Sequence, residues 1–364
     1  MSRQPLRIID ANLNRSREGL RVLEDVARFL LDDAELSRGL KALRHDLARQ
    51  TKSLRIGLLS ERDAEHDVAH PSSVYREKGK RCIDVTSPAD LLDLITANSK
   101  RVEESLRVLE ELAKLPELSP MLDLTDFEQA RFTLYVLERE LISRISRRDK
   151  AQKMCGLYVI LDRQFLAGRD ELEVAEEIIE GGARVIQLRD KQTGKGELLF
   201  LARKLKDLCS RAGALFIVND YLDLAVAANA DGLHIGQSDL PVSVARKQLP
   251  VDMIVGCSVT TATQAIKAQT EGADYIAVGS VFPTTTKKEI TMVGVDLLKE
   301  LKQIVSIPLV AIGGINRNNI GEVLAAGADA IAVISAVLGE KDAMKAAQEL
   351  VAKLDLGEAE CQSE

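Results

Sequence analysis

The segment Gly182-Ala183-Arg184-Val185-Ile186-Gln187-Leu188-Arg189-Asp190-Lys191 leads from a glycine through a short apolar run into a group of charged side chains. A glycine that ends a helix and the apolar run after it together predict entry into a buried parallel strand. The same junction returns as Gly272-Ala273-Asp274-Tyr275 and as Gly327-Ala328-Asp329-Ala330. Because the junction recurs, we predict successive βα units in the C-terminal part of the chain.

Eight β-rich segments alternate with helix-like segments in this part, which we place at residues 155–354. We expect the strands at 157–161, 185–188, 215–218, 232–235, 254–257, 275–279, 309–312 and 330–334. Eight βα units in about 210 residues predict a (β/α)8 TIM barrel. A doubly wound open sheet is the alternative, although such sheets usually have fewer strands and no GxGxxG follows the first strand here. We expect residues 355–364 to form a flexible tail.

Residues 1–148 are predicted to form an all-α domain with an internal repeat. The segment 11–27 returns at 97–113, an offset of 86 residues, and ten of these seventeen positions are identical. The leucines of each copy lie on one helix face, so two related helices at about 11–29 and 97–115 are expected. We also predict a long helix at about 125–146, an irregular segment at 66–82 and a basic linker at 144–153. The opposite charges three residues apart in each copy fit solvated ion pairs, or a ligand or subunit interface on a pseudo-twofold axis.

Composition excludes several classes of protein. The net charge of −7 lies entirely in residues 151–364, and neither part has the basic excess of a nucleic-acid-binding protein. No apolar run reaches the roughly 18 residues of a membrane span, and the N-terminus lacks the apolar core of a secretory signal. The five cysteines form no CxxC pair, which is typical of reduced thiols. We therefore expect a cytoplasmic protein.

Charged and polar residues follow the predicted strands at the end where TIM barrels carry their active sites. Gln187, Arg189 and Lys191 alternate, so a strand would point them the same way. The two cations suit phosphate groups. A surface ion pair with Asp190 is the alternative.

Two carboxylates follow the third and fourth strands. Asp220, next to Asn219, and Asp239 could bind Mg²⁺ and leave places for waters and phosphate oxygens. Capping of the following helices is an equally good explanation for either residue. His234 lies on an apolar strand, so we expect a packed, hydrogen-bonded side chain rather than a catalytic base.

Three further positions favour phosphate binding. Ser258 could donate its hydroxyl to a phosphate or cap the next helix. The loop 284–287 offers three hydroxyls and a lysine, although a flexible surface loop would have the same composition. Gly313-Gly314 and Ile334-Ser335 follow the last two strands, where many barrels build a phosphate site from backbone amides and a helix N-terminus.

Taken in order, these motifs resemble the thiamine-phosphate synthase family over about residues 155–352. They are Gln-Leu-Arg-x-Lys from Gln187, Asn219-Asp220, His-Ile-Gly-Gln-x-Asp from His234, Pro-Thr-x-Thr-Lys-Lys from Pro283, and Gly-Gly-Ile from Gly313. The resemblance implies a TIM barrel, Mg²⁺ as cofactor and a transferase. The implied reaction condenses 4-amino-2-methyl-5-(diphosphooxymethyl)pyrimidine with 4-methyl-5-(2-phosphoethyl)thiazole, or with a carboxylated form of it that also releases CO2. The products are thiamine phosphate and pyrophosphate. The repeat domain resembles the helical extension fused to some members.

The resemblance also implies the site residues. Asp220 and Asp239 would bind Mg²⁺. The catalytic residues would be Arg189, Lys191, Ser258 and Lys287. The substrate-binding residues would be Gln187, Leu188, Arg189, Asp190, Lys191, Asn219, Ser258, Thr284, Thr285, Thr286, Lys287, Gly314, Ile334 and Ser335. The partners would be the two phosphorylated substrates, without nucleic acid or membrane, and a homo-oligomer is compatible with the sequence.

Two other functions stay open at this point. A related barrel could act on thiazole phosphate as an isomerase or aromatase, although such an enzyme would be expected to lose the cations and carboxylates that this chain keeps. A phosphate-ligand sensor would bind without turnover. The N-terminal domain could also add a step of its own in the same pathway.

Overall fold

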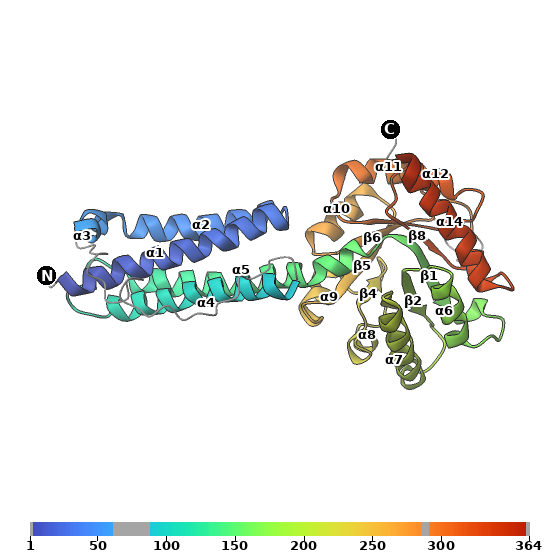
Figure 1. The fold of residues 1–364 in the computed structure, drawn as a ribbon, viewed down its shortest axis with the longest axis horizontal. Coiled ribbons are helices and arrows are strands. Elements are labelled where there is room, and N and C mark those ends of the chain that lie inside the picture. Colours follow the sequence, from blue (N-terminus) through green and yellow to red (C-terminus); the bar gives the residue numbers. More distant parts are fainter. Residues whose placement is uncertain (1–2, 61–87, 285–290, 362–364) are drawn as a thin grey trace, which may run out of the picture. The chain divides into compact units, whose positions relative to one another are not determined.

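The computed structural model describes residues 3–60, 88–284 and 291–361. Its contacts divide the chain into two compact units, Met1–Ser146 and Arg147–Glu364 (Figure 1). Each unit has its own hydrophobic core. Among the described residues, no helix is both long and apolar enough to cross a membrane.

The first unit is helical, and the repeat lies on its two long neighbours α1 and α4, as expected. These helices approach closely at Gly19, where an added Cβ would lie 2.6 Å from Val102 Cγ2 and 3.0 Å from the Asn98 carbonyl oxygen. The expected irregular segment 66–82 lies outside the described residues. The elements are α1 (Arg3–Asp25), the π-helical turn η1 (Val26–Leu30), α2 (Ala34–Gln50), the 3-10 turn η2 (Lys52–Leu54), α3 (Arg55–Ser60), α4 (Pro88–Ala113) and α5 (Leu124–Gln152).

The expected linker at 144–153 is wrong, because α5 continues to Gln152. No glycine or proline interrupts the sequence from Leu124 to Gln152, so nothing in it ends the helix earlier. The last turns of α5, from Arg147 on, belong to the second unit, and two of their cations pair with carboxylates of that unit. Arg147 Nε lies 2.8 Å from Asp274 Oδ1, and Lys150 Nζ lies 3.0 Å from Asp252 Oδ2.

A buried carboxylate occupies the same place in both copies of the repeat. Glu24 accepts a hydrogen bond from Arg44 Nε of α2 at 3.0 Å, and Glu110 accepts one from Arg131 Nε of α5 at 2.7 Å. The two glutamates are 3% and 0% exposed, and each also contacts the arginine three residues before it. In both copies the buried glutamate therefore binds an arginine of another helix. The predicted ion pair with the arginine three residues earlier is present as well, but it is only one part of each cluster.

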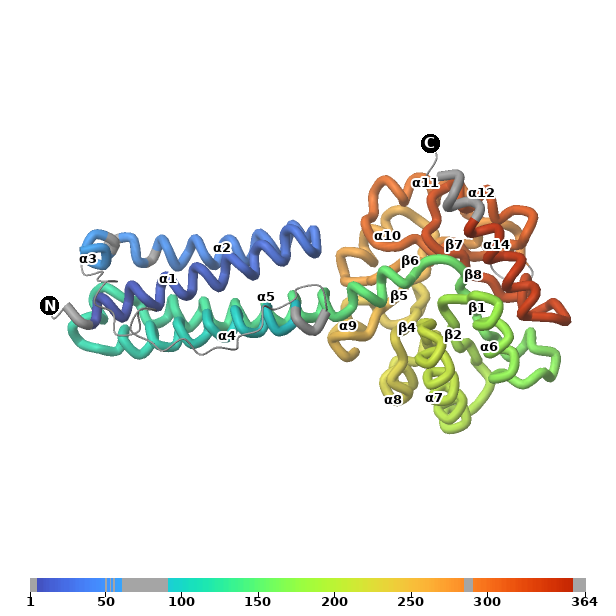
Figure 2. The backbone as a smooth tube through the Cα atoms, in the orientation of Figure 1, coloured from blue at the N-terminus to red at the C-terminus, as the bar shows by residue number. Residues whose placement is uncertain are grey.

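The second unit is a closed barrel of eight parallel strands in sequence order, which confirms the predicted fold (Figures 1 and 2). The strands are β1 (Gly156–Asp162), β2 (Val185–Arg189), β3 (Leu215–Asn219), β4 (Gly232–Ile235), β5 (Ile254–Val259), β6 (Tyr275–Val278), β7 (Leu309–Ile312) and β8 (Ala330–Val333).

Helices surround the barrel, and the last of them corrects the expected tail. Leu350 and Leu354 are buried, and α14 continues to Cys361, so the chain after 354 is helical as far as Cys361. The helices are η3 (Arg163–Phe165), α6 (Glu171–Glu180), α7 (Lys195–Ala212), α8 (Leu222–Ala227), α9 (Val242–Gln248), α10 (Ala262–Thr270), α11 (Gly294–Ile304), α12 (Ile320–Ala325), α13 (Ser335–Leu338) and α14 (Ala343–Cys361).

The recurring junctions have a structural reason. Asp274 and Asp329, each just before a strand, accept a backbone N–H from the start of the preceding strand at 2.8 Å. Asp231 does the same for Phe216 at 3.0 Å. Each carboxylate also pairs with a lysine or arginine of a neighbouring helix. These contacts lie where the strands begin, so they stabilise the end of the barrel opposite the predicted site.

We expect a chain of residues 147–364 to fold by itself, because its core is separate from that of the helical unit. A chain that starts at 153 lacks Arg147 and Lys150 and serves as the comparison. It should be less stable by about 2 kcal/mol, since the half-buried Asp274 loses one of its two cations. Urea unfolding followed by circular dichroism measures the free energy of unfolding of both chains. Equal stability of the two chains, or aggregation of the longer one, would contradict the expectation.

Candidate active site at the mouth of the barrel

The end of β2 contributes the first group of polar side chains. Gln187 is buried in the barrel, and Arg189 follows it two residues later on the same face of the strand. Leu188 points the other way, into the core between strands and helices. Its side chain is therefore not available to a substrate, and its predicted role in binding would fall to its backbone.

Arg189 is held in place by a residue that the sequence analysis missed. Its guanidinium binds the carboxylate of Asp162, which ends β1 and is 2% exposed. Asp162 also accepts a hydrogen bond from the Gln164 N–H at 3.1 Å. The signal was present in the sequence, because Asp162 is a polar residue directly after the first apolar run.

Lys191 and Asp220 join the second and third strand ends, with Lys191 Nζ 3.0 Å from Asp220 Oδ2. The expected alternative, an ion pair of the cations with Asp190, is wrong. Asp190 instead accepts hydrogen bonds from the Gln192 N–H and from the Thr193 N–H and hydroxyl. Burial raises the pKa of Asp190, but these hydrogen bonds outweigh it and hold the pKa below its usual value. The Asp190 carboxylate thus holds the conformation of the loop after β2.

Neither candidate metal ligand caps a helix. Asp220 has a left-handed backbone (φ +61°), and its N–H donates to the His234 carbonyl at 2.8 Å. Asp239 Oδ2 accepts the Gly236 N–H at 2.8 Å. The N-caps of α8 and α9 are Tyr221 and Pro241, without side-chain capping bonds. Each carboxylate therefore keeps an oxygen for another partner.

This donor set fits Mg²⁺ better than a metal held by protein alone. The described part of the chain contains no group of three His, Cys, Asp or Glu residues that could hold a metal ion. Mg²⁺ commonly takes one or two carboxylates and completes its shell with water and substrate phosphates. Two carboxylates beside a diphosphate would meet that requirement.

Ser258, near the end of β5, faces inward. Its Oγ lies 2.9 Å from His234 Nε2, and α10 is capped by Thr261 instead. His234 is buried and hydrogen-bonded, as expected. Gln237 Nε2 donates to the Ser258 carbonyl at 2.7 Å and so ties the loop after β4 to β5.

A cavity of about 280 Å³ opens at the ends of β5 to β8. It gathers five predicted positions, namely Ser258, Thr284, Gly314, Ile334 and Ser335, and adds three hydroxyl residues that were not predicted, namely Thr260, Ser280 and Thr291. Thr285, Thr286 and Lys287 lie outside the described residues. The cavity is large enough for one small ring with a short side chain, and six of its lining residues carry hydroxyls, namely Ser258, Thr260, Ser280, Thr284, Thr291 and Ser335.

Gly313 and Gly314 are required by a close backbone approach. Their φ angles are +102° and +65°, and a Cβ on Gly314 would lie 2.4 Å from the Pro283 carbonyl oxygen. The Phe282 N–H donates to the Gly313 carbonyl at 3.0 Å. The loops after β6 and β7 are therefore joined along one wall of the cavity.

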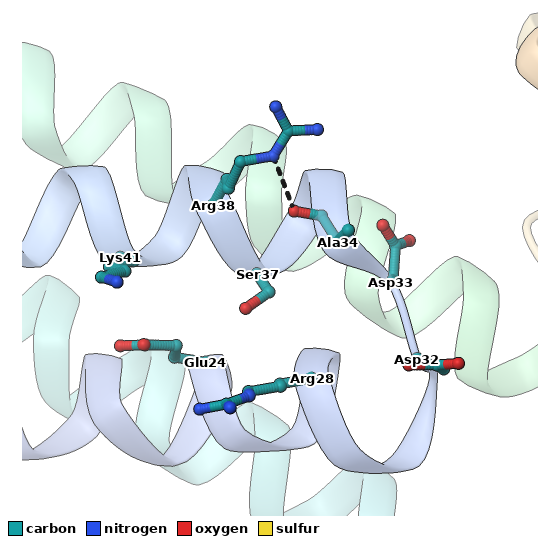
Figure 3. A pocket seen from close by; sticks show the side chains of 8 residues that line it. All are labelled: Glu24, Arg28, Asp32, Asp33, Ala34, Ser37, Arg38 and Lys41. Carbon is teal, nitrogen blue, oxygen red and sulfur yellow. Dashed lines mark hydrogen bonds between the residues drawn. The ribbon is translucent and has the colours of Figure 1, made fainter.

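The helical unit contains a separate hollow of about 420 Å³ at the turn between α1 and α2 (Figure 3). Figure 3 shows Glu24 and Lys41 facing one another across it, whereas Arg38 points away and donates its Nε to the Ala34 carbonyl at 3.0 Å. Acidic and basic side chains are equally represented, so the lining favours neither a cation nor an anion. It consists of Glu24, Arg28, Asp32, Asp33, Ala34, Ser37, Arg38 and Lys41.

Known proteins are similar to both units. Residues 157–337 match the family described as thiamine monophosphate synthase, and residues 7–140 match the ThiD2 family. A thiamine-phosphate synthase of Thermosynechococcus vestitus is 39% identical over 97% of this chain and 95% of its own length. One from Synechocystis sp. is 38% identical over 96% of both chains.

Among solved structures, a thiamine phosphate pyrophosphorylase from Pyrococcus furiosus is 40% identical. It covers 57% of this chain and 98% of its own length, with a TM-score of 0.53. The similarity thus includes the barrel together with its mouth, and in the longer relatives it includes the helical unit as well. The chain belongs to the thiamine-phosphate synthase family.

Proposed function

We propose that this chain joins the pyrimidine diphosphate to the thiazole phosphate and releases pyrophosphate, the reaction that membership of the thiamine-phosphate synthase family implies. The observation that supports this most strongly is the division of the mouth into two halves. Cations and carboxylates gather after β2, β3 and β4, and a hydroxyl-lined cavity lies at β5 to β8. One half suits a diphosphate and the other suits a small phosphorylated ring.

The first half would favour departure of the diphosphate. The bond between the pyrimidine methylene carbon and the diphosphate oxygen breaks, and its electron pair leaves with pyrophosphate. Arg189 and Lys191 would stabilise that charge, and Lys287 would add to them. Asp162 keeps the Arg189 guanidinium in place before the substrate arrives. Such fixed charges stabilise a transition state because they need no reorganisation during the reaction.

Asp220 and Asp239 would hold Mg²⁺, which when bound supplies further positive charge to the diphosphate. Asp220 is already paired with Lys191 at 3.0 Å, so this carboxylate lies next to a cation of the predicted diphosphate site.

The second half would hold the thiazole phosphate. Thr284, Ser335 and the Gly314 backbone line the cavity and suit a phosphate. The thiazole ring nitrogen then forms the new bond to the methylene carbon. Its lone pair carries no proton, so the step needs no general base. A carboxylated thiazole would release CO2 in addition, and a homo-oligomer is compatible with the proposal.

Pyrophosphate release is the direct test. The full chain is incubated with Mg²⁺ and both substrates, and each substrate is then omitted in turn. We expect release only with both substrates, with thiamine phosphate formed in equal amount. Binding of thiazole phosphate without release would instead support the isomerase or the sensor.

Asp162→Asn tests the positioning of Arg189. The change keeps the side-chain shape and removes the charge that holds the guanidinium. We expect kcat/KM for the pyrimidine diphosphate to fall about 10- to 100-fold, because a small displacement of a charged group has a large effect on rate. Asp170→Asn is the matched control, since Asp170 only caps α6. An unchanged kcat/KM for Asp162→Asn would show that Asp162 does not position Arg189 for the reaction.

Gly314→Ala tests the wall of the thiazole half. The new Cβ must displace the Pro283 carbonyl, so we expect KM for the thiazole phosphate to rise by at least about tenfold, a difference of about 1.4 kcal/mol. Gly321→Ala is the matched control, because an added Cβ there meets nothing within 4 Å and lies in helix α12. Steady-state kinetics would refute the assignment if both variants resembled the unmodified protein.

A further inference from the structure

A continuous chain of hydrogen bonds crosses the interior of the barrel below its mouth. Gln187 Nε2 donates to the Tyr158 hydroxyl at 2.7 Å, which lies 3.1 Å from the Tyr275 hydroxyl. The Tyr275 hydroxyl lies 3.0 Å from His234 Nδ1, and His234 Nε2 lies 2.9 Å from Ser258 Oγ. The two tyrosines are 2% and 0% exposed. The chain thus joins two predicted substrate-binding residues on β2 and β5 through three buried side chains.

With the Gln187 amide nitrogen on Tyr158, the donors and acceptors of this chain have one direction that leaves no buried donor without a partner. The Gln187 amide nitrogen can only donate, so the Tyr158 oxygen accepts and its own hydrogen is left for Tyr275. Tyr275 then donates to His234 Nδ1, which must carry no hydrogen. His234 therefore carries its hydrogen on Nε2 and donates it to Ser258 Oγ. The Ser258 hydrogen remains for a third group, and that residue lines the cavity.

The reverse direction would leave a buried donor without a partner. If Ser258 donated to His234 and each group passed its hydrogen toward β2, the Tyr158 oxygen would receive two donors. The Tyr158 hydrogen would then have no acceptor along the chain. A buried donor without an acceptor is unfavourable, because it has lost its hydrogen bond to water and gained none in return. Only a rotation of the Gln187 amide, with its carbonyl turned toward Tyr158, would make the reverse direction consistent.

The surroundings of the tyrosines maintain the chain. Burial raises the pKa of both hydroxyls well above the usual value, so both keep their hydrogens at neutral pH. The ring of Tyr275 lies over Gly256, where a Cβ would come within 2.0 Å of Cζ. The same ring stacks on His234 with centroids 5.6 Å apart. Tyr275 therefore has little room to move away from its two partners.

We propose that Tyr158, Tyr275 and His234 are positioning residues that fix the hydrogen-bonding direction of Gln187 and Ser258 toward the substrate. Gln187 presents its carbonyl as an acceptor, since this oxygen has no hydrogen bond to the described residues. Ser258 presents its hydroxyl as a donor. An acceptor on β2 and a donor on β5 together suit a ring that carries both an amino group and a ring nitrogen. The nature of this ligand rests on the proposed function.

The direction can be measured without any turnover. The full chain is labelled with ¹⁵N-histidine, and His234→Gln assigns the signals of this residue among the four histidines. We expect nuclear magnetic resonance to find the hydrogen on Nε2 and none on Nδ1. A hydrogen on Nδ1, alone or with one on Nε2, would overturn the proposal. Because no substrate is present, this result is independent of whether the proposed function is correct.

The consequence for specificity is measured by binding. Calorimetry compares the affinity of the 4-amino pyrimidine diphosphate with that of its 4-oxo analogue, in the absence of thiazole phosphate. Tyr275→Phe interrupts the chain and lets the Gln187 amide rotate, so we expect the preference for the amino compound to fall about tenfold. Tyr158→Phe, which removes the partner of Gln187 itself, should have a similar effect.

The control is Tyr135→Phe, which removes a hydroxyl on the exposed side of α5 and should leave the preference unchanged. Equal loss of affinity for both pyrimidines in the two buried variants, with the preference retained, would show that the tyrosines act only on packing and would overturn the proposal. If neither pyrimidine binds the unmodified protein, the proposed function fails, and the histidine spectrum still decides the direction of the chain.

Discussion

Closure of eight parallel strands in sequence order is the constraint on which the barrel unit depends. Because every strand runs the same way, all carboxyl ends meet at one mouth, and all strand beginnings meet at the other end. The chain uses the two ends differently. Asp231, Asp274 and Asp329 bind strand amides and helix cations where strands begin. The polar groups at the mouth are thereby freed from holding the barrel together, and they are available for binding.

The barrel interior sets a second constraint, since groups buried there must find hydrogen-bond partners among themselves. Tyr158 and Tyr275 come from opposite parts of the barrel sequence, and their hydroxyls meet at 3.1 Å. Apolar side chains would pack equally well in the barrel interior. They could not, however, make the hydrogen-bonding direction of a residue on β5 depend on that of a residue on β2. The polar interior therefore links the two halves of the mouth, although the side chains that make the link do not themselves line the cavity.

The sequence predicted features that repeat and missed features that depend on closure. All eight strands were expected within two residues of their bounds, because apolar runs between glycine junctions are local signals. Arg189 and Asp220 were predicted from an equally local signal, because each is a charged residue at the end of an apolar run. Asp162 and the tyrosine pair were not, since their partners lie far along the chain and only barrel closure brings them together. Leu188 was included with its motif, although strand alternation turns its side chain outward.

In the helical unit, too, buried polar groups need partners inside the protein, and the two copies of the repeat meet this need in the same way. A carboxylate that is 3% or 0% exposed is stable only with cations beside it, and duplication has given Glu24 and Glu110 equivalent sets. In each half, one arginine comes from the same helix and one from the next long helix. Loss of the arginine on the neighbouring helix would leave a buried charge with an exposed partner only. The charges thus tie α2 to α1 and α5 to α4, a distinction that the nearly identical leucine faces of α1 and α4 could not make.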